Sequence, residues 1–545
     1  MSNVSVDTDW WRHAVIYQVY PRSFADANGD GMGDLPGIID RLPYLATLGV
    51  DALWLNPFYA SPQHDAGYDV ADYRRVDERF GETADAERLI AAAHDLGLRV
   101  IFDIVPNHTS SDHPWFVEAL QTPPGTGIWT RYHCVRGRGA NGEEPPNDWL
   151  SVFGGLAWTQ IPDPSTGEPS GWWYLHLFDS AQPDLNWNDP EVWNEHERVL
   201  RHWFDRGVDG FRIDVAHGLV KTEGYPDSGE RPDMYGLEND VLVLPQWDQP
   251  GVHDIYRAWR RVADSYDPPR VFCGEVVVAT PESHSMYLRP DELHTAFNFH
   301  YLRSRWEAAH LREVIDHSLE TAAQVGAPCT WVLSNHDIRR HATRLAPETG
   351  DDVADATRGL ARARAASLIM LALPGSAYLY QGEELGLPEV TDLPADKRED
   401  PTFHRTNGEV VGRDGCRVPI PWRTTGASFG FSDTGASWLP QPEYFGELSV
   451  EAQTGAAGST LEMYREALRL RHQLSLGEGT LSWLDSPEDT LAFTINNVTV
   501  VAAMGEQSLA WPAAELLLAS SPDVVIVDGQ VTLPPDTAAW ISGRR

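Results

Sequence analysis

The chain has 545 residues and a formal net charge of −38, with 42% hydrophobic and 22% charged residues. This composition is typical of a globular protein with material for a large core, and the length exceeds that of one ordinary domain. The acidic charge argues against nucleic acid or an anionic membrane as a partner, because both bind through basic patches.

Eight short apolar runs, each ending in polar residues, are the predicted strands of the chain. Near-continuous apolar runs are typical of strands that are buried on both faces. Helical patterns lie between several of them, such as residues 83–97, with Thr83 as the expected cap and Gly97 at the end. Strand–helix units in this series predict an α/β protein with a (β/α)8 barrel. The eight runs cover residues 14–24, 50–59, 99–108, 207–216, 270–278, 295–302, 330–337 and 375–384.

Two departures from an even barrel predict further domains. A long stretch after the third strand is rich in Trp, Gly and Pro, which indicates an inserted domain. After residue 465 the pattern changes to alternating strands, which predicts a C-terminal antiparallel β-domain. The five strand runs expected in it cover residues 480–486, 490–497, 498–504, 523–529 and 537–542. The predicted division is 1–108 for the first part of the barrel, 109–188 for the inserted domain, 189–464 for the second part with a subdomain after strand eight, and 465–545 for the C-terminal β-domain.

The connection after the fourth strand, residues 217–253, is longer than a usual strand-to-helix loop. Loops at that end of a barrel form the rim of the active site. We therefore expect this loop to limit the length of the substrate, although its Gly, Pro, Asp and Glu content also fits a solvated loop with no role at the site.

The cysteines and the start of the chain indicate a cytoplasmic protein. Four scattered cysteines without CxxC spacing are typical of reduced thiols (Cys134, Cys273, Cys329 and Cys416). The first residues lack the pattern of a secretory signal, and no stretch approaches 18 consecutive apolar residues. We predict no membrane partner and a monomer or homodimer.

Polar residues stand at the ends of the predicted strands, where a barrel carries its chemistry. Arg212 and Asp214 are two apart and share one face of a strand, while Glu275 and Asp337 end two other strands. One Arg-x-Asp by itself is compatible with a structural ion pair. Three carboxylates meeting at one mouth favour catalysis, because cleavage of an acetal needs two carboxyl groups flanking the bond. Arg212 would keep Asp214 ionised, and the apolar setting of Glu275 would favour its protonated form.

Short motifs in the chain resemble those of a known family. DIVPNH (103–108), GFRIDVAHG (210–218), FCGEV (272–276) and LSNHD (333–337) resemble the four short regions of the α-amylase superfamily, glycoside hydrolase family 13. QPDLNW (182–187) is similar to the fifth region in its α-glucosidase and oligo-1,6-glucosidase branch. The resemblance continues in QVYPRSFADANGDGMGDLPGI, YQGEELGL and GRDGCRVPIPW and covers nearly all of the first 460 residues.

The resemblance implies a role for each matching residue. Asp214 would be the nucleophile, Glu275 the acid/base and Asp337 a third carboxylate that binds sugar hydroxyls. His108, His336 and Arg212 would line the same glucose site.

HDAGYDVADY (64–73) resembles the segment that closes the pocket behind one glucose in this branch. Asp65 would grip the 4-hydroxyl of the non-reducing end, and Tyr68 would stack on the ring. Arg417 is the arginine expected to pair with Asp65, with Arg413 as the alternative. Phe153 of WLSVFGG is either an aromatic sugar contact or a core residue of the inserted domain.

DANGDGMGD (26–34) has oxygen-bearing residues at alternate positions, as a calcium loop has. The twelfth position is Gly37 instead of Glu, so this is not a helix–loop–helix calcium hand. Relatives of the resembling family bind calcium here, which implies a structural Ca2+, although a turn rich in Asp, Asn and Gly has a similar composition. The expected ligands are Asp26, Asn28, Asp30, the main-chain oxygen of Met32, and Asp34.

The predicted function is that of a retaining, exo-acting α-glucosidase that releases α-glucose from short oligosaccharides such as maltose. The alternatives are an oligo-1,6-glucosidase and a transglucosidase or sucrose-acting enzyme of the same family. Val215 after the nucleophile accompanies α-1,6 preference in this branch, but the following Ala216 and His217 differ from typical oligo-1,6-glucosidases. A remote alternative is the non-catalytic ectodomain of a transporter, which carries a membrane anchor and often lacks the carboxylates.

Overall fold

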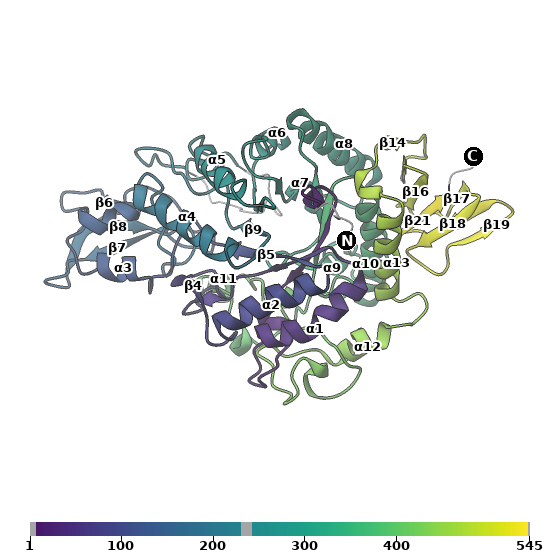
Figure 1. Cartoon of the computed structure of the whole chain (residues 1–545), viewed down its shortest axis with the longest axis horizontal. Helices are drawn as coiled ribbons and strands as arrows, with labels where there is room; N and C mark the ends of the chain where they lie inside the picture. Colours follow the sequence, from purple (N-terminus) through teal and green to yellow (C-terminus); the bar gives the residue numbers. More distant parts are fainter. Residues whose placement is uncertain (1–6, 230–241, 543–545) are drawn as a thin grey trace.

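The computed structural model describes residues 7–229 and 242–542 of the chain. Its centre is an eight-stranded parallel sheet in the order β11-β10-β9-β5-β2-β1-β13-β12, drawn in the middle of Figure 1. The amide of Asn298, after β11, donates to the carbonyl of Thr330 in β12 at 3.0 Å, which nearly closes the sheet into a barrel. The strands are β1 (Val15–Val19), β2 (Ala52–Leu55), β5 (Arg99–Ile104), β9 (Gly210–Ile213), β10 (Val271–Gly274), β11 (Thr295–Ala296), β12 (Thr330–Val332) and β13 (Ser376–Tyr380).

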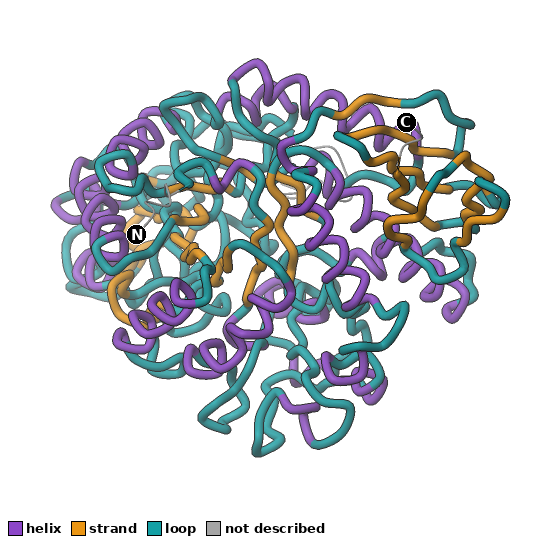
Figure 2. Tube along the Cα trace, turned by 45° about the vertical axis from the view of Figure 1, so that its right-hand side comes forward, coloured by secondary structure: helices purple, strands orange, loops and turns teal. Residues whose placement is uncertain are grey.

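Each of the eight runs predicted from the sequence contains one of these strands, so the barrel prediction is confirmed. The strands are buried at almost every position because helices cover the outside of the barrel. Figure 2 shows these helices around the central strands. The long ones are α1 (Leu35–Leu48), α2 (Thr83–Asp95), α4 (Pro190–Phe204), α5 (Val252–Ala263), α8 (Ala308–Val325) and α10 (Asp352–Ala372).

The start of α2 differs from the sequence prediction. Thr83 is the first helical residue, and the N-cap is Glu82. The amide of Glu82 donates to the side chain of Asp85 at 2.8 Å, three residues further on, and this contact fixes the cap one residue earlier than predicted.

The inserted domain lies between β5 and α4, at the left end of Figure 1. It begins with α3 (Pro114–Ala119) and forms an antiparallel sheet of β6 (Cys134–Arg136), β8 (Pro169–Leu175) and β7 (Trp158–Pro162). Its buried aromatic side chains, Trp149, Phe153 and Phe178 among them, share one cluster with Val215 and Trp247 from the loop after β9. The inserted domain therefore packs over the carboxyl end of the barrel, where that loop begins.

The chain after β13 (residues 381–459) is mostly irregular, with the short helices α11 (Pro401–Arg405) and α12 (Val450–Gln453), and leads to α13 (Thr460–Gln473). The C-terminal β-domain then forms two antiparallel sheets, in the orders β14-β15-β16-β21-β18 and β17-β20-β19. All five runs predicted here contain a strand, whereas β17, β18 and β20 were not predicted. The strands are β14 (Leu481–Trp483), β15 (Thr490–Ile495), β16 (Val498–Ala503), β17 (Leu509–Pro512), β18 (Glu515–Ala519), β19 (Val525–Val527), β20 (Gln530–Leu533) and β21 (Thr537–Ser542).

The long connection predicted after the fourth strand lies between β9 and α5. The described parts of the loop 217–253 contain no helix or strand before α5, and residues 230–241 of this loop lie outside the described residues.

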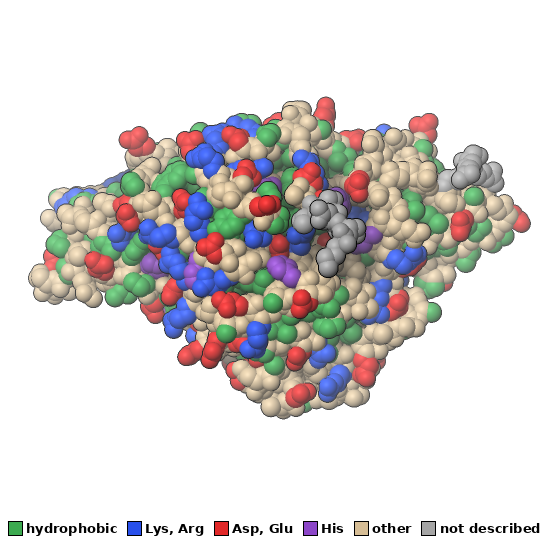
Figure 3. All heavy atoms as spheres, viewed as in Figure 1, with side chains coloured by type: hydrophobic (Ala, Val, Ile, Leu, Met, Phe, Trp, Pro, Cys, Tyr) green, Lys and Arg blue, Asp and Glu red, His purple; other side chains and the backbone are tan. Residues whose placement is uncertain are grey.

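Lys and Arg side chains are interspersed with Asp and Glu over the face seen in Figure 3. Within 7–229 and 242–542, no helix has the length and apolar character needed to cross a membrane.

Candidate active site

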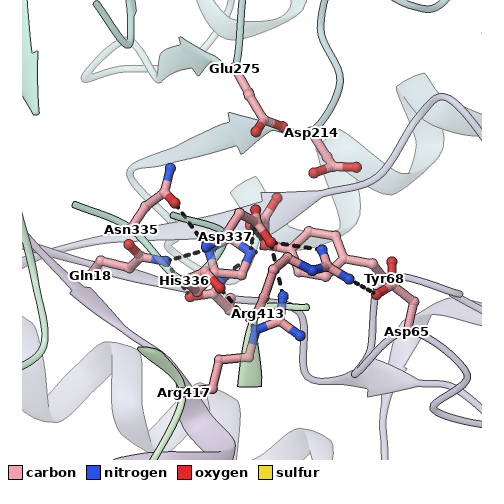
Figure 4. A network of polar contacts seen from close by, with 12 residues as sticks. Gln18, Asp65, Tyr68, Asp214, Glu275, Asn335, His336, Asp337, Arg413 and Arg417 are labelled. Carbon is pink, nitrogen blue, oxygen red and sulfur yellow. Dashed lines mark hydrogen bonds and ion pairs between the residues drawn. The ribbon is translucent and has the colours of Figure 1, made fainter. Parts of the chain in front are cut away.

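The carboxyl ends of three barrel strands, β9, β10 and β12, bring the predicted residues together. Arg212 lies in β9 and Asp214 follows it, while Glu275 follows β10 and Asp337 lies beyond β12. Figure 4 shows the carboxylates of Glu275 and Asp214 beside each other, with Asp337 and two arginines next to them. The predicted convergence of carboxylates from three strands is thus present in the structure.

Arg212 is the centre of a buried charge cluster. Its Nη1 contacts Oδ1 of Asp214 at 2.7 Å and Oδ1 of Asp103 at 3.1 Å, and its Nη2 contacts Oε2 of Glu275 at 2.7 Å. Its side chain is 0% exposed, and the guanidinium carbon lies 5.0 Å from the ring centre of Trp54. Three carboxyl groups therefore surround one guanidinium away from water, which favours the presence of a proton among them.

Sequence reasoning assigned no role to Asp103, although it opens the DIVPNH motif. It lies in β5 directly opposite Arg212 of the neighbouring β9, so the two side chains point to the same side of the sheet. Burial raises the pKa of Asp103 to about 7, although Arg212 opposes this shift. A lone acidic residue inside an apolar strand run was the signal that could have found it.

The expectation that Arg212 keeps Asp214 ionised is wrong for the free site, because Asp103 and Glu275 share the same guanidinium. Burial raises the pKa of Asp214, Arg212 lowers it, and the negative charges of Glu275 and Asp103 raise it again. The result in the free site is a pKa above the usual value of an aspartate.

The environment of Glu275 also differs from the prediction. Its carboxylate is not in an apolar setting, because Oε2 accepts from the amide of Val215 at 3.0 Å in addition to its contact with Arg212. Oε1 is buried, and among the residues that the structure describes it has no hydrogen-bond partner. Val215 has a φ of 46°, which is unusual for a β-branched residue. Strained backbone of this kind often accompanies functional sites.

Asp337 lies in a second charge group beside the first. Its Oδ1 contacts Arg413 at 2.8 Å and Arg417 at 2.9 Å, and its Oδ2 lies 3.0 Å from Nε2 of His336. Burial alone would raise the pKa of Asp337, but His336 and the two arginines lower it more, so this carboxyl group has a pKa well below the usual value.

Arg413, and not Arg417, pairs with Asp65, at 2.8 Å from Nη2 to Oδ1. The choice of Arg417 was therefore wrong, and the alternative holds. The Nε of Arg417 donates to the carbonyl of His336, which directs this side chain to Asp337. Arg413 is held in turn by Asp400, which accepts from its Nε at 2.6 Å. Burial raises the pKa of Asp65 to about 6 against the opposing effect of Arg413.

The predicted ring contacts surround the same place. Tyr68 stacks on His336, with ring centres 5.2 Å apart and an interplanar angle of 7°. Nε2 of Gln182 donates to Nε2 of His108 and to Oδ2 of Asp65, both at 3.1 Å. Burial lowers the pKa of His108 to about 4, so it is neutral at pH 7.

Phe153 agrees with one of the two readings that its sequence left open, a core residue of the inserted domain. It is 4% exposed and belongs to the aromatic cluster of the inserted domain. Its ring also lies 4.9 Å from the guanidinium carbon of Arg413. Phe153 is thus a core residue that borders the Asp65–Arg413 pair.

Several polar residues at the site were missed, and each had a sequence signal. Gln182 opens the quoted QPDLNW motif, and Asp400 precedes a proline as a helix N-cap does. Gln18 opens another quoted motif and contacts Nδ1 of His336 at 2.8 Å (Figure 4).

In the predicted calcium loop, side-chain oxygens accept hydrogen bonds from nearby backbone amides. Asp26 accepts from the amides of Gly29 and Gly31, at 2.6 and 2.8 Å. Asp34 is the N-cap of α1 and accepts from the amide of Gly37 at 2.7 Å. Asn28 and Asp30 each accept from an amide two residues on, at 2.9 and 2.8 Å. Across the described ranges, no group of three or more His, Cys, Asp or Glu side chains is placed to hold a metal ion.

A (β/α)8 barrel with buried, closely spaced carboxyl groups at the carboxyl ends of its strands defines a glycoside hydrolase of the barrel type. A model of the α-amylase catalytic domain matches residues 18–479. The chain belongs to the α-amylase family, and it is an α-glucosidase-like glycoside hydrolase.

Proteins similar to most of the chain include a probable α-glucosidase, an oligo-1,6-glucosidase and an α-glucosyl transfer enzyme. The chain is 37% identical to a probable α-glucosidase of Rhizobium meliloti (strain 1021), over 89% of this chain and 87% of that protein. It is 35% identical to an oligo-1,6-glucosidase of Parageobacillus thermoglucosidasius, over 85% and 84% of the two chains. The crystal structure of an α-glucosyl transfer enzyme is similar with a TM-score of 0.86 at 34% identity and covers 98% of this chain and 99% of its own.

Proposed function

We propose that this protein is a retaining, exo-acting α-glucosidase that releases α-glucose from the non-reducing end of short α-glucosides such as maltose. The observation that carries the proposal is the pair of Asp65 and Arg413 beside Asp337. In this proposal the charged pair binds hydroxyls of the terminal sugar and blocks a chain that would continue beyond it. An enzyme with such a closed end acts on the terminal sugar.

In the proposed mechanism Asp214 attacks the anomeric carbon, and Glu275 protonates the leaving oxygen. Oε1 of Glu275 supports this role, because it is the carboxyl oxygen left without a partner among the described residues. The glucose ring becomes positively charged in the transition state. That charge stabilises an ionised Asp214 in a cluster where one guanidinium faces three carboxyl groups. Water then releases glucose from the covalent intermediate, with Glu275 as the base.

Asp337 and its neighbours would bind the sugar without taking part in proton transfer. The two arginines beside Asp337 favour its ionised form, which accepts hydrogen bonds from sugar hydroxyls. Tyr68, His108 and His336 would contact the same glucose.

The stereochemistry of the reaction tests the mechanism. Double displacement retains the configuration, so α-glucose should appear before β-glucose when hydrolysis of a nitrophenyl α-glucoside, which releases only one glucose, is followed by NMR. Initial release of β-glucose would contradict the assignment of Asp214 as a covalent nucleophile.

The choice of substrate needs a direct comparison. Initial rates on maltose, isomaltose, sucrose and trehalose, measured side by side, should be highest on maltose. A faster rate on isomaltose would favour an oligo-1,6-glucosidase. Val215 and the similarity to the 35% identical oligo-1,6-glucosidase support this alternative. Transfer of glucose to a sugar acceptor would favour a transglucosidase. The similarity to the α-glucosyl transfer enzyme supports this alternative.

We also propose that the loop 26–34 binds a structural Ca2+, supported by its side-chain oxygens at alternate positions. A metal bound only by the folded state stabilises it, so a chelator should lower the Tm by a few degrees. Asp30→Ala, which removes an exposed carboxylate of the loop, should lower the Tm and abolish the response to the chelator. An unchanged Tm in the chelator and after added Ca2+ would mean that the internal hydrogen bonds hold the loop by themselves.

Location in the cytoplasm is a proposal as well. All four cysteines are free thiols in the structure, and three of them are buried. Free thiols in this number are typical of a reducing compartment.

A further inference from the structure

Arg405, the last residue of α11, reaches from the segment after β13 to the inserted domain. Its Nε donates to the carbonyl of Gly154 at 2.9 Å, and its Nη2 donates to the carbonyl of Leu156 at 3.4 Å. Its Nη1 lies 3.3 Å from Oδ2 of Asp179, and both side chains are about four-fifths buried, with 21% and 19% exposure. One side chain thus holds two segments of the inserted domain.

The first of these segments leads to Arg413. Gly154 follows Phe153, whose ring lies against the guanidinium of Arg413. Gly154 and Gly155 have φ values of +99° and +78°, where a side chain is strained, and a Cβ on Gly155 would lie 3.4 Å from Nη2 of Arg405. The turn that carries Phe153 is therefore shaped for the close approach of Arg405.

The second segment leads to Asp65. Asp179 begins a tight turn in which its Oδ1 accepts from the amide of Ala181 at 2.8 Å. Its own amide donates to Oε1 of Gln182 at 3.0 Å. The Nε2 of Gln182 then donates to Oδ2 of Asp65 at 3.1 Å. Gln182 is 0% exposed, so water does not readily replace these contacts.

We propose that Arg405 is a positioning residue that latches the inserted domain to the segment after β13 and so holds the Asp65–Arg413 pair in place for the terminal glucose. The two segments that Arg405 contacts lead to the two members of this pair, through Phe153 to Arg413 and through Gln182 to Asp65. Loss of Arg405 should leave Asp214 and Glu275 in place and weaken the binding of the terminal glucose. The proposal rests on the function proposed above, in which Asp65 binds the 4-hydroxyl.

Kinetics on an aryl α-glucoside test the latch. Arg405→Ala should raise KM about tenfold and change kcat less than about twofold, since it weakens binding of substrate and transition state alike. The KM of Arg405→Lys should lie between those of the wild-type protein and Arg405→Ala, because a lysine makes fewer of the three contacts. Asp179→Asn should also raise KM. The KM of the double variant should be no higher than that of Arg405→Ala alone, because both substitutions remove the same contact between Arg405 and Asp179. The matched control is Arg423→Ala, an arginine in the same subdomain whose partner Asp433 lies 3.9 Å away at the surface.

The decisive measurement compares a substrate with its 4-deoxy analogue. The wild-type protein should prefer the 4-hydroxyl strongly in kcat/KM, and Arg405→Ala should reduce this preference about tenfold at an unchanged kcat for the parent substrate. A purely structural role would lower the Tm and leave the preference unchanged, and that result would overturn the latch. Absence of any preference in the wild-type protein would instead refute the role of Asp65, and with it both proposals.

Discussion

Asp214→Asn should abolish turnover of every α-glucoside while the protein stays folded. An amide cannot form the glycosyl ester, and loss of a catalytic nucleophile costs about 10⁴-fold or more in kcat. The fold should survive because the substitution keeps the shape of the side chain and removes one of three carboxyl groups from a single guanidinium. Initial rates on maltose and on a nitrophenyl glucoside, with a thermal melt of each protein, measure both effects.

The control for this variant is Asp433→Asn, an exposed aspartate far from the cluster with 91% of its side chain accessible. It should leave both rates unchanged. If Asp214→Asn retains more than a few per cent of the activity, Asp214 is not the nucleophile and the retaining mechanism needs another carboxylate.

Glu275→Gln should separate substrates by their leaving groups. Hydrolysis of maltose needs protonation of the leaving sugar and should fall about 10²- to 10⁴-fold. A nitrophenyl glucoside needs little protonation, so its first step should continue. The second step lacks its base, and a burst of nitrophenol should precede a slow steady state. Stopped-flow absorbance measures the burst.

A different result would assign Glu275 another role. If maltose and the nitrophenyl glucoside lose activity by the same factor and no burst appears, Glu275 is not the acid. Its contacts with Arg212 and with the amide of Val215 would then be structural, and the partner of Asp214 would have to be found among Asp103 and Asp337.

The sequence by itself determined the barrel and the identity of its charged residues. Strands such as β5 and β9 are buried on both faces, so their apolar runs are visible without knowledge of any contact. Arg212 and Asp214 are visible for the same reason, because a charge inside such a run needs a partner. The exposed or half-buried strands β17, β18 and β20 lack this pattern, and they were missed.

Only the tertiary structure decided how these charges are shared. Arg413 and Arg417 lie four residues apart in one irregular segment, and nothing in the motif says which one reaches Asp65. The direction of each side chain depends on its other acceptors, Asp400 for Arg413 and the carbonyl of His336 for Arg417. These acceptors lie 13 and 81 residues away along the chain, so the pairing is a property of the packed molecule and is absent from the motif itself.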